Sequence, residues 1–321
     1  MPELPEVEVV RAGVEPAVTG AVVAGIEIFD ERSLRRHDAT AGSFGDLLVG
    51  RRILGAVRRG KFLWLPLDSG RALVIHLGMS GQVLLRSPGQ TDDRHLRIRL
   101  AVEHTESDSP GPRELWLNFV DQRVFGSMSV DSMHPTSDGF AAGYSGRGEG
   151  EWTGLLPSQV SHIARDPLDP AFSDDLFRAG LRRKKTGIKR ALLDQTLISG
   201  IGNIYADEAL FAARLHYEQP TASLDGAQGD ALLLALRSIL HRALVEGGTS
   251  FDAQYVNVNG QSGYFAHSLE VYGRQGKPCS RCGAILVRQT FMNRGSHFCP
   301  ACQVVDGAPV CDSATRFQAP S

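Results

Sequence analysis

Four cysteines near the end of the chain form the clearest chemical pattern in the sequence. Cys279 and Cys282 make one C-x-x-C pair, and Cys299 and Cys302 make a second pair after sixteen intervening residues. Four thiolates at this spacing satisfy tetrahedral Zn²⁺ and leave no coordination position for water. The pattern therefore predicts one structural zinc ion and argues against a catalytic metal. The fifth cysteine, Cys311, has no partner pattern and no predicted role.

The segment between the two pairs, ILVRQTFMNRGSHF, is typical of a β-hairpin with Arg294 near its tip. A zinc module of this kind would hold the Arg294 cation rigidly. The alternative is that Arg294 is an ordinary solvated turn residue.

A glycine-rich turn, SGIGN, joins two expected helices in the segment DQTLISGIGNIYADEALFAAR. The N–H groups of such a turn and of the following helix N-terminus favour a phosphate ligand, and the amide of Asn203 is a further donor. The basic run RRKKTGIKR lies just upstream. Together these features are typical of a DNA-binding helix pair. The alternative is an ordinary helix C-cap.

The first ten residues, MPELPEVEVV, place Pro2, Glu3 and Glu6 close together. Removal of Met1 would leave Pro2 as a secondary amine, and an α-amino group titrates at a pKa of about 7.7 to 8.0. Such an amine can attack a sugar C1′ and form an iminium, with Glu3 as general acid and base and Glu6 on the same helix face. The alternative is helix capping, in which proline and carboxylates only start the helix.

These residues need a scaffold, and the first part of the chain predicts β-structure. After an opening helix with Val7, Val10 and Val14 on one face, six runs are rich in branched and aromatic residues. Their sequences are AVVAGIEIF, RILGAVRR, KFLWLPL, ALVIHLGM, HLRIRLAV and ELWLNFVD. Short strands at this spacing predict a β-sandwich or barrel of about 130 residues.

From residue 174 the apolar spacing becomes helical. The helical segments are SDDLFRAGLRRK, GIKRALLDQTLI, NIYADEALFAARL and GDALLLALRSILHRALVEGG. The sequence contains no internal repeat.

A composition of 42% hydrophobic and 22% charged residues is typical of a soluble globular protein. The absence of an export-signal pattern and of a long apolar stretch predicts a cytoplasmic protein that does not enter membranes.

The formal net charge is only −2, but the charges are segregated. Residues 51–100 hold ten Arg and Lys against three acids, residues 178–190 hold seven and no acid, and residues 272–302 hold five and no acid. Residues 101–175 hold thirteen acids against four Arg. This distribution predicts one face that binds polyanions. The alternative is scattered surface charge.

Seven motifs occur in a characteristic order along almost the whole chain. They are PELPEVE, RRGKFLWL, HLGMSGQ, DQRVFG, SGIGNIYADEALF, GYF with VYGR, and C-x-x-C with FMNR before the second C-x-x-C. Over residues 2–302 the sequence resembles bacterial formamidopyrimidine-DNA glycosylases of the Fpg/Nei family, above all actinobacterial members. The resemblance implies a bifunctional DNA glycosylase and AP lyase of base excision repair. Such an enzyme excises 8-oxoguanine and formamidopyrimidines through a proline Schiff base and then cuts the strand by β,δ-elimination.

The resemblance also implies roles for individual catalytic residues. Pro2 matches the nucleophile, Glu3 the acid that assists removal of the base, and Glu6 a supporting carboxylate. Lys61 matches a lysine credited with proton donation in β-elimination, and Arg294 matches the zinc-finger arginine that grips phosphates and is assigned to δ-elimination.

Further residues match contacts to DNA in the family. His95 and Lys184 match backbone contacts, and Asn203 and Tyr205 match the loop of the helix-two-turn-helix motif.

Three more residues, Met79, Arg123 and Phe125, match the trio that fills the void left by an extruded base. Apolar and planar side chains can recover part of the stacking lost on base flipping, and arginine can contact the orphaned cytosine. Without the resemblance, Met79 and Phe125 would be read as core residues and Arg123 as part of a surface ion pair. The chain departs from the family at Gln122, where proline is frequent, and this change would loosen the loop that carries Arg123.

The implied fold is a multidomain α and β protein with an N-terminal β-sandwich and flanking helix. The expected parts are a catalytic β-sandwich domain at 2–133, a connector at 134–173, a helix-two-turn-helix domain at 174–265, a zinc finger at 266–303 and a disordered tail at 304–321. The implied partner is double-stranded DNA with an oxidised base or abasic site, bound by a cytoplasmic, nucleoid-associated monomer. Two rivals remain open: an endonuclease VIII-like glycosylase for oxidised pyrimidines, and a non-catalytic zinc protein that binds damaged DNA.

Overall fold

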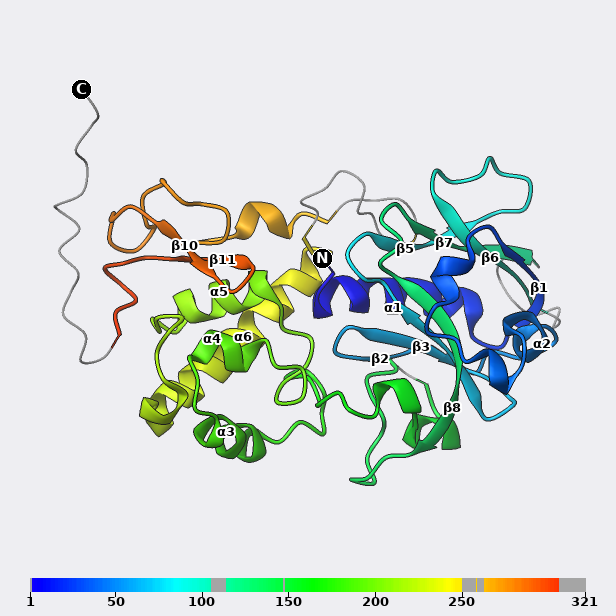
Figure 1. The fold of residues 1–321 in the computed structure, drawn as a ribbon, viewed down its shortest axis with the longest axis horizontal. Coiled ribbons are helices and arrows are strands. Elements are labelled where there is room, and N and C mark those ends of the chain that lie inside the picture. The colour runs from blue at the N-terminus through cyan, green and yellow to red at the C-terminus, as the bar shows by residue number, and fades with distance from the viewer. Residues whose placement is uncertain (1, 105–113, 147, 250–257, 259–262, 306–321) are drawn as a thin grey trace.

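A computed structural model describes residues 2–104, 114–146, 148–249, 258 and 263–305. The described chain has a β-rich half and a helical half, with the start of helix α1 (Leu4–Val18) at their junction (Figure 1). Residues 105–113, 250–257 and 259–262, and most of the expected tail at 304–321 with Cys311, lie outside these residues.

Two antiparallel sheets make up the β-rich half. One sheet has the strand order β1 (Val22–Ile28), β6 (Leu96–Glu103), β7 (Glu114–Asp121) and β5 (Gly81–Arg86). The other has the order β2 (Val57–Arg59), β3 (Phe62–Pro66), β4 (Arg71–His76), β8 (Ser127–Pro135) and β9 (Leu155–Pro157). Apolar side chains from both sheets join Val7, Val10 and Val14 of α1 in one buried cluster. The predicted β-sandwich with a flanking helix is therefore confirmed.

The sequence pattern missed three of these strands. All six predicted runs contain a strand, but β5, β8 and β9 were not predicted. Strand β5 begins with Gly and Gln, and β8 carries Ser, Asp and His among its apolar residues. Their pairing is long-range, as in Leu73 opposite Val130, so neighbouring sheet residues rather than local propensity select the strand conformation.

Helices α3 (Asp174–Arg183), α4 (Ile188–Leu192), α5 (Asn203–Ala212) and α6 (Gly226–Val245) make up the other half. Residues 203–211 of α5 are all buried, because α6 and the hairpin of β10 (Val287–Phe291) and β11 (Arg294–Phe298) pack against it. The predicted hairpin is confirmed, and Arg294 is the first residue of its second strand.

The remaining short helices are α2 (Phe44–Leu48), η1 (Glu31–Leu34), η2 (Ala39–Ala41), η3 (Glu151–Gly154), η4 (Ser158–Val160), η5 (Thr221–Ser223) and η6 (Phe265–Ser268). None of the helices in the described part of the chain is long and apolar enough to cross a membrane.

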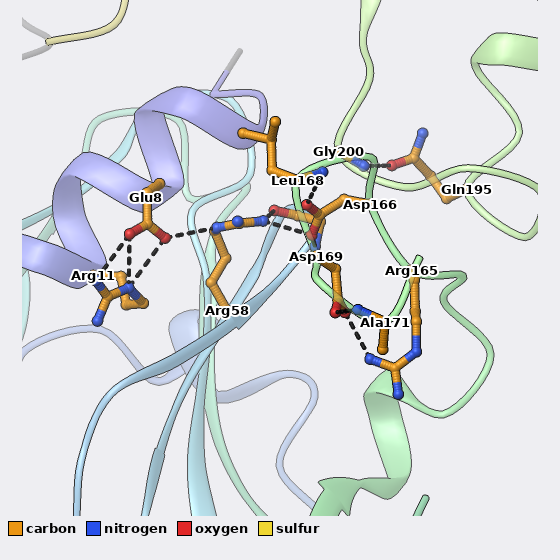
Figure 2. A network of polar contacts seen from close by, with 11 residues as sticks. Glu8, Arg11, Arg58, Arg165, Asp166, Leu168, Asp169, Ala171, Gln195 and Gly200 are labelled. Carbon is orange, nitrogen blue, oxygen red and sulfur yellow. Dashed lines mark hydrogen bonds and ion pairs between the residues drawn. The ribbon is translucent and has the colours of Figure 1, made fainter. Parts of the chain in front are cut away.

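A buried ion-pair network joins the two halves (Figure 2). The Arg58 guanidinium lies 2.9 Å from the Glu8 carboxylate and 2.8 Å from the Asp166 carboxylate. The side chains of Arg58 and Asp166 are each 1% exposed. Asp166 also accepts a hydrogen bond of 3.2 Å from the Gly60 N–H. The connecting segment is therefore tied to both α1 and the turn that precedes Lys61.

A second buried carboxylate attaches the zinc-finger region to the helices. Glu208 of α5 accepts hydrogen bonds from the N–H groups of Glu270, Val271 and Tyr272 at 3.0, 2.9 and 2.8 Å. These bonds satisfy a carboxylate that is only 2% exposed. They fix the chain that leads into the zinc finger against α5.

Candidate active site

The carboxylate of Glu3 lies at the N-terminal end of α5. It accepts hydrogen bonds from the N–H groups of Gly202 at 2.6 Å and Ile204 at 3.0 Å. The helix dipole and these free N–H groups make this position favourable for an anion. A Cβ atom at Gly202 would lie 2.3 Å from the Glu3 carboxylate, so this close approach requires glycine. Burial nevertheless raises the pKa of Glu3, and Lys61 opposes that rise.

Glu6 holds three other groups in place around the same helix start. One of its oxygens accepts the Glu3 N–H at 2.8 Å, and the other accepts the Tyr205 hydroxyl at 2.7 Å and the Thr249 hydroxyl at 2.8 Å. The helix-capping alternative is thus part of the structure, because Glu6 reaches back to the N-cap residue Glu3. Capping and a chemical role are compatible here, since Glu3 still faces α5.

Lys61 follows a tight turn at Gly60, whose φ of 55° suits glycine. The Lys61 ammonium donates at 2.9 Å to the carbonyl oxygen of Ile201, which is the central residue of the SGIGN turn. Burial lowers the pKa of Lys61, while the negative charge of Glu3 opposes this shift and the positive charge of Arg294 adds to it. Glu3 and Lys61 therefore both favour their neutral forms more than exposed residues do.

Two cavities adjoin Arg294. The first, of about 540 Å³, is lined among others by Pro2, Lys61, His76 and Arg294. The second, of about 640 Å³, is lined by Glu3, Met79, Asn203 and Arg294 among others. Residues from the N-terminus, strand β4 and its neighbouring turns, α5 and the zinc-finger hairpin thus line two cavities that share Arg294.

The sequence motifs did not predict a site role for His76, although His76 lines the first cavity beside Pro2. Burial, together with the nearby cations Arg36, Arg35 and Lys61, lowers the pKa of His76 to about 4. Among the described residues, its Nδ1 atom has no hydrogen-bond partner. The signal in the sequence was the histidine of the HLGM motif, at the end of an apolar run.

Arg294 is positioned through its neighbour Gly295. The Gly295 carbonyl accepts hydrogen bonds from Asn203 Nδ2 and Lys189 Nζ, both at 3.1 Å. Lys189 is fully buried and forms an ion pair of 2.6 Å with Asp207. The charge pattern of the sequence placed Lys189 in a basic surface block, and this interpretation is wrong for Lys189. Its positive charge instead attaches the hairpin to the helices.

The other predicted DNA contacts occupy different environments. Tyr205 is fully buried, with its hydroxyl on Glu6. Lys184 forms an ion pair of 2.5 Å with Asp194, and its side chain is 38% exposed. His95 is half-buried and has a φ of 66°. Their contacts with DNA remain predictions.

Met79, Arg123 and Phe125 lie on two adjacent turns of the β-rich half. Met79 is 44% exposed and Phe125 is 50% exposed, so neither is a core residue. Among the described residues, the Arg123 guanidinium forms no ion pair. A Cβ at Gly78 would lie 2.4 Å from the backbone of Phe125, so the two turns touch directly. The alternatives of core packing and a surface ion pair do not describe these three side chains.

The four predicted metal ligands form one cluster. The sulfur atoms of Cys279, Cys282, Cys299 and Cys302 all lie within 4.8 Å of one another and form no disulfide. The Cys279–Cys302 distance is 4.0 Å and the Cys282–Cys299 distance is 3.5 Å. Tetrahedral Zn–S bonds of 2.3 Å place sulfur atoms about 3.8 Å apart. The cluster therefore fits a structural Zn²⁺, which would connect the two ends of the hairpin that carries Arg294.

Three family models match consecutive parts of the chain. The formamidopyrimidine-DNA glycosylase N-terminal domain matches residues 1–128, and the formamidopyrimidine-DNA glycosylase H2TH domain matches residues 163–254. A zinc finger found in FPG and IleRS matches residues 276–304. These models cover the β-rich half, the helical half and the cysteine cluster in turn.

Similar proteins carry the same family name. A formamidopyrimidine-DNA glycosylase of Leifsonia xyli is 64% identical over 305 residues, covering 94% of this chain and 99% of the relative. One of Thermobifida fusca is 53% identical over 304 residues, covering 94% and 97%. The crystal structure of Lactococcus lactis Fpg with abasic-site DNA has a TM-score of 0.74 at 29% identity, covering 94% and 99%. That of Thermus thermophilus Fpg has a TM-score of 0.73 at 35% identity, covering 94% and 98%.

The fold and the site define a three-part protein in which a β-sandwich, a helical domain and a four-cysteine zinc finger surround one opening. The chain belongs to the formamidopyrimidine-DNA glycosylase family.

Proposed function

We propose that the protein is a DNA glycosylase and abasic-site lyase of base excision repair that acts on oxidised purines and abasic sites in double-stranded DNA. Curated relatives bear the name formamidopyrimidine-DNA glycosylase. Solved complexes of Lactococcus lactis Fpg contain DNA with an abasic site or with Fapy-dG. The observation that carries the proposal is the convergence of Pro2, Lys61 and Arg294 on one cavity, with Glu3 on the adjoining one.

Pro2 acts as the nucleophile once Met1 has been removed. Its nitrogen forms a bond to C1′ of the deoxyribose while the bond from C1′ to the base breaks, and the base leaves with that electron pair and a proton. The Pro2 nitrogen loses its proton, which balances the proton taken up by the base. The nitrogen lone pair then opens the C1′–O4′ bond to form an iminium, and Glu3 supplies the proton to O4′. The raised pKa of buried Glu3 supports this role, because the acid keeps its proton to higher pH.

Strand cleavage uses the same adduct. Removal of a C2′ proton sends an electron pair through the sugar to expel the 3′ phosphate, and a second elimination expels the 5′ phosphate. Lys61 has a lowered pKa and assists proton transfer in the first elimination. Arg294 grips the flanking phosphates and assists the second elimination. Glu6 supports the site by accepting a hydrogen bond from the Glu3 backbone N–H, which orients Glu3.

DNA binding places the void-filling residues in the stack. Met79 occupies the space of the extruded base, Arg123 contacts the orphaned base and Phe125 wedges the neighbouring pair. His95, Lys184, Asn203 and Tyr205 contact the backbone or support the elements that do. The structural zinc holds the Arg294 hairpin. The active form is a monomer in the bacterial cytoplasm.

An end-labelled duplex with 8-oxoguanine opposite cytosine tests the proposal. We expect release of 8-oxoguanine and a cut strand with phosphate at both new ends, as β,δ-elimination requires. A matched thymine-glycol duplex should be cut more slowly. Preference for thymine glycol would favour the endonuclease VIII-like alternative, and binding without release or cleavage would favour the non-catalytic one.

A further inference from the structure

Arg35 makes an unusual set of contacts with the loop of residues 121–126, which carries Arg123 and Phe125. Its Nη1 atom donates to the carbonyl oxygens of Gly126 at 2.6 Å and Val124 at 3.1 Å. Its Nη2 atom donates to the carbonyl oxygen of Phe125. One guanidinium thus holds three consecutive carbonyl groups of the loop.

The opposite side of this loop is held by a buried carboxylate. Asp121 is fully buried and accepts hydrogen bonds from the N–H groups of Gly126 at 2.6 Å and Arg123 at 3.1 Å. It also accepts the Ser80 hydroxyl at 2.5 Å, which ties the loop to the turn that carries Met79. Loop N–H groups therefore face Asp121, and loop carbonyl groups face Arg35.

The loop backbone needs such support. Val124 has a φ of 56°, a conformation that is unfavourable for a β-branched residue. Position 122 is Gln, so no proline ring restricts the backbone there. Since Arg123 and Phe125 are exposed, their own side chains add little packing that would fix the loop. The contacts with Arg35 and Asp121 supply the constraint instead.

The chain segment around Arg35 is itself fixed to the β-rich half. It follows η1, where Ser33 is fully buried. The Val130 N–H of β8 donates to His37 Nδ1 at 3.4 Å, and Gln159 Nε2 donates to the Arg36 carbonyl at 3.3 Å. The Arg35 side chain is exposed, but the two residues that follow it, Arg36 and His37, are attached to Gln159 and to β8.

We propose that Arg35 is a positioning residue that fixes the loop of residues 121–126, so that Arg123 and Phe125 enter the DNA stack in one geometry and read the base opposite the lesion. This inference rests on the proposed function for its consequence in DNA, but its structural part concerns the free protein. Arg35 acts through the loop backbone and does not touch the reacting atoms.

Three variants separate this role from a simple contribution of charge. Arg35→Ala removes the contacts and the charge, Arg35→Lys keeps the charge but cannot span three carbonyl groups, and Arg36→Ala removes a neighbouring charge without touching the loop. If Arg35 only attracted DNA phosphate, Arg35→Lys would resemble the wild type and Arg35→Ala would resemble Arg36→Ala. If Arg35 positions the loop, both Arg35 variants should have a less ordered loop and a weaker preference for the base opposite the lesion. Arg36→Ala should change neither property.

Hydrogen exchange in the free protein is the first measurement. We expect the amides of Arg123 and Gly126 to exchange about tenfold faster in both Arg35 variants, the effect of losing one charge-assisted hydrogen bond. Exchange in Arg36→Ala should equal that of the wild type. Unchanged exchange in Arg35→Ala, with a cooperative thermal transition confirming that the variant is folded, would overturn the proposal.

The second measurement is the ratio of kcat/KM for 8-oxoguanine opposite cytosine to that opposite adenine. We expect both Arg35 variants to lower this ratio, and Arg36→Ala to leave it unchanged. Equal losses on both duplexes would contradict a role in reading the opposite base. If the wild type itself fails to excise 8-oxoguanine, the proposed function fails, and the exchange measurement still decides whether Arg35 fixes the loop.

Discussion

The N–H of Gly202 at the start of α5 donates a hydrogen bond of 2.6 Å to the carboxylate of Glu3, which lies 199 positions earlier at the start of α1. Two helix starts therefore meet at one carboxylate. The contact brings the N-terminal residues of the β-rich half onto the SGIGN turn of the helical half. It is also the reason why Glu3 is buried beside the second cavity while remaining hydrogen-bonded.

Glu3→Gln should separate the two proposed activities. Gln keeps the size of the side chain but cannot supply a proton, so excision of 8-oxoguanine should fall by about a hundredfold or more, the usual range for a general acid. Cleavage of a preformed abasic site should be retained better, because its deoxyribose also exists as a ring-opened aldehyde that can react with Pro2 without a proton from Glu3. Both rates can be measured on duplexes of the same sequence. Equal losses on the two substrates would contradict the role of Glu3 in base removal.

The pH dependence of excision gives a second test of the same residue. Burial raises the pKa of Glu3, and the proton needed for sugar opening is present only below that raised pKa. The rate of base excision at saturating DNA should therefore fall as pH rises through it. The pH profile of abasic-site cleavage should lack this decline. A flat excision profile from weakly acidic to alkaline pH would count against Glu3 as the acid.

Lys61→Met should trade activity for stability. Burial lowers the pKa of Lys61, so the folded state binds fewer protons there than the unfolded state, and wild-type stability rises with pH toward the ordinary lysine pKa. The Met side chain carries no charge, so the variant avoids the cost of burying the Lys61 ammonium. The melting temperature of the variant should therefore exceed that of the wild type at neutral pH, and this difference should narrow as pH rises. Abasic-site cleavage should drop about a hundredfold. A variant that is less stable at neutral pH would show that the Ile201 hydrogen bond outweighs the cost of burial.

Asp166→Asn should be strongly destabilising. It leaves the fully buried Arg58 with one carboxylate fewer, and removing one partner from a buried ion pair costs about 3–5 kcal/mol. Arg32→Ala is a matched control, because Arg32 is 73% exposed and water screens its pair with Asp30, so its loss should change the free energy of unfolding far less. Urea unfolding measures both free energies. Similar values for the two variants would mean that the Arg58 network contributes little to joining the two halves.

Zinc removal should disable the hairpin rather than the β-sandwich. Cys299→Ser should lower the zinc content measured by elemental analysis and weaken binding to abasic-site DNA, because Arg294 loses its metal-fixed support. Cys311→Ser is the control and should retain zinc and DNA binding. Full DNA affinity in a zinc-free Cys299→Ser protein would contradict the structural role given to the metal.

Local sequence patterns predicted some residues of the site, but they did not predict which distant residues those side chains contact. The zinc ligands and the hairpin around Arg294 follow from short-range spacing, so the sequence alone located them. The bond from Thr249 to Glu6 joins residues 243 positions apart, and no local pattern encodes it. The burial of Lys189 escaped prediction for the same reason, because its partner Asp207 lies on another helix.

The opening sequence offered helix capping and nucleophilic chemistry as alternatives, and the structure shows why spacing could not choose between them. Glu6 completes the cap through the Glu3 N–H, while the Glu3 side chain is directed to α5. The choice depends on what lies opposite the helix start, which only the tertiary fold reveals. Strands β5 and β8 illustrate the same limit, since their partners in the sheets determine them.

Borohydride trapping with peptide mapping tests the central claim most directly. The protein is incubated with an 8-oxoguanine duplex and sodium borohydride, digested, and the cross-linked peptide is sequenced by mass spectrometry. The account predicts a reduced deoxyribose adduct on a peptide that begins at Pro2 and lacks Met1. An adduct on Lys61 or another lysine, or cleavage without any adduct by a chain that retains Met1, would contradict it.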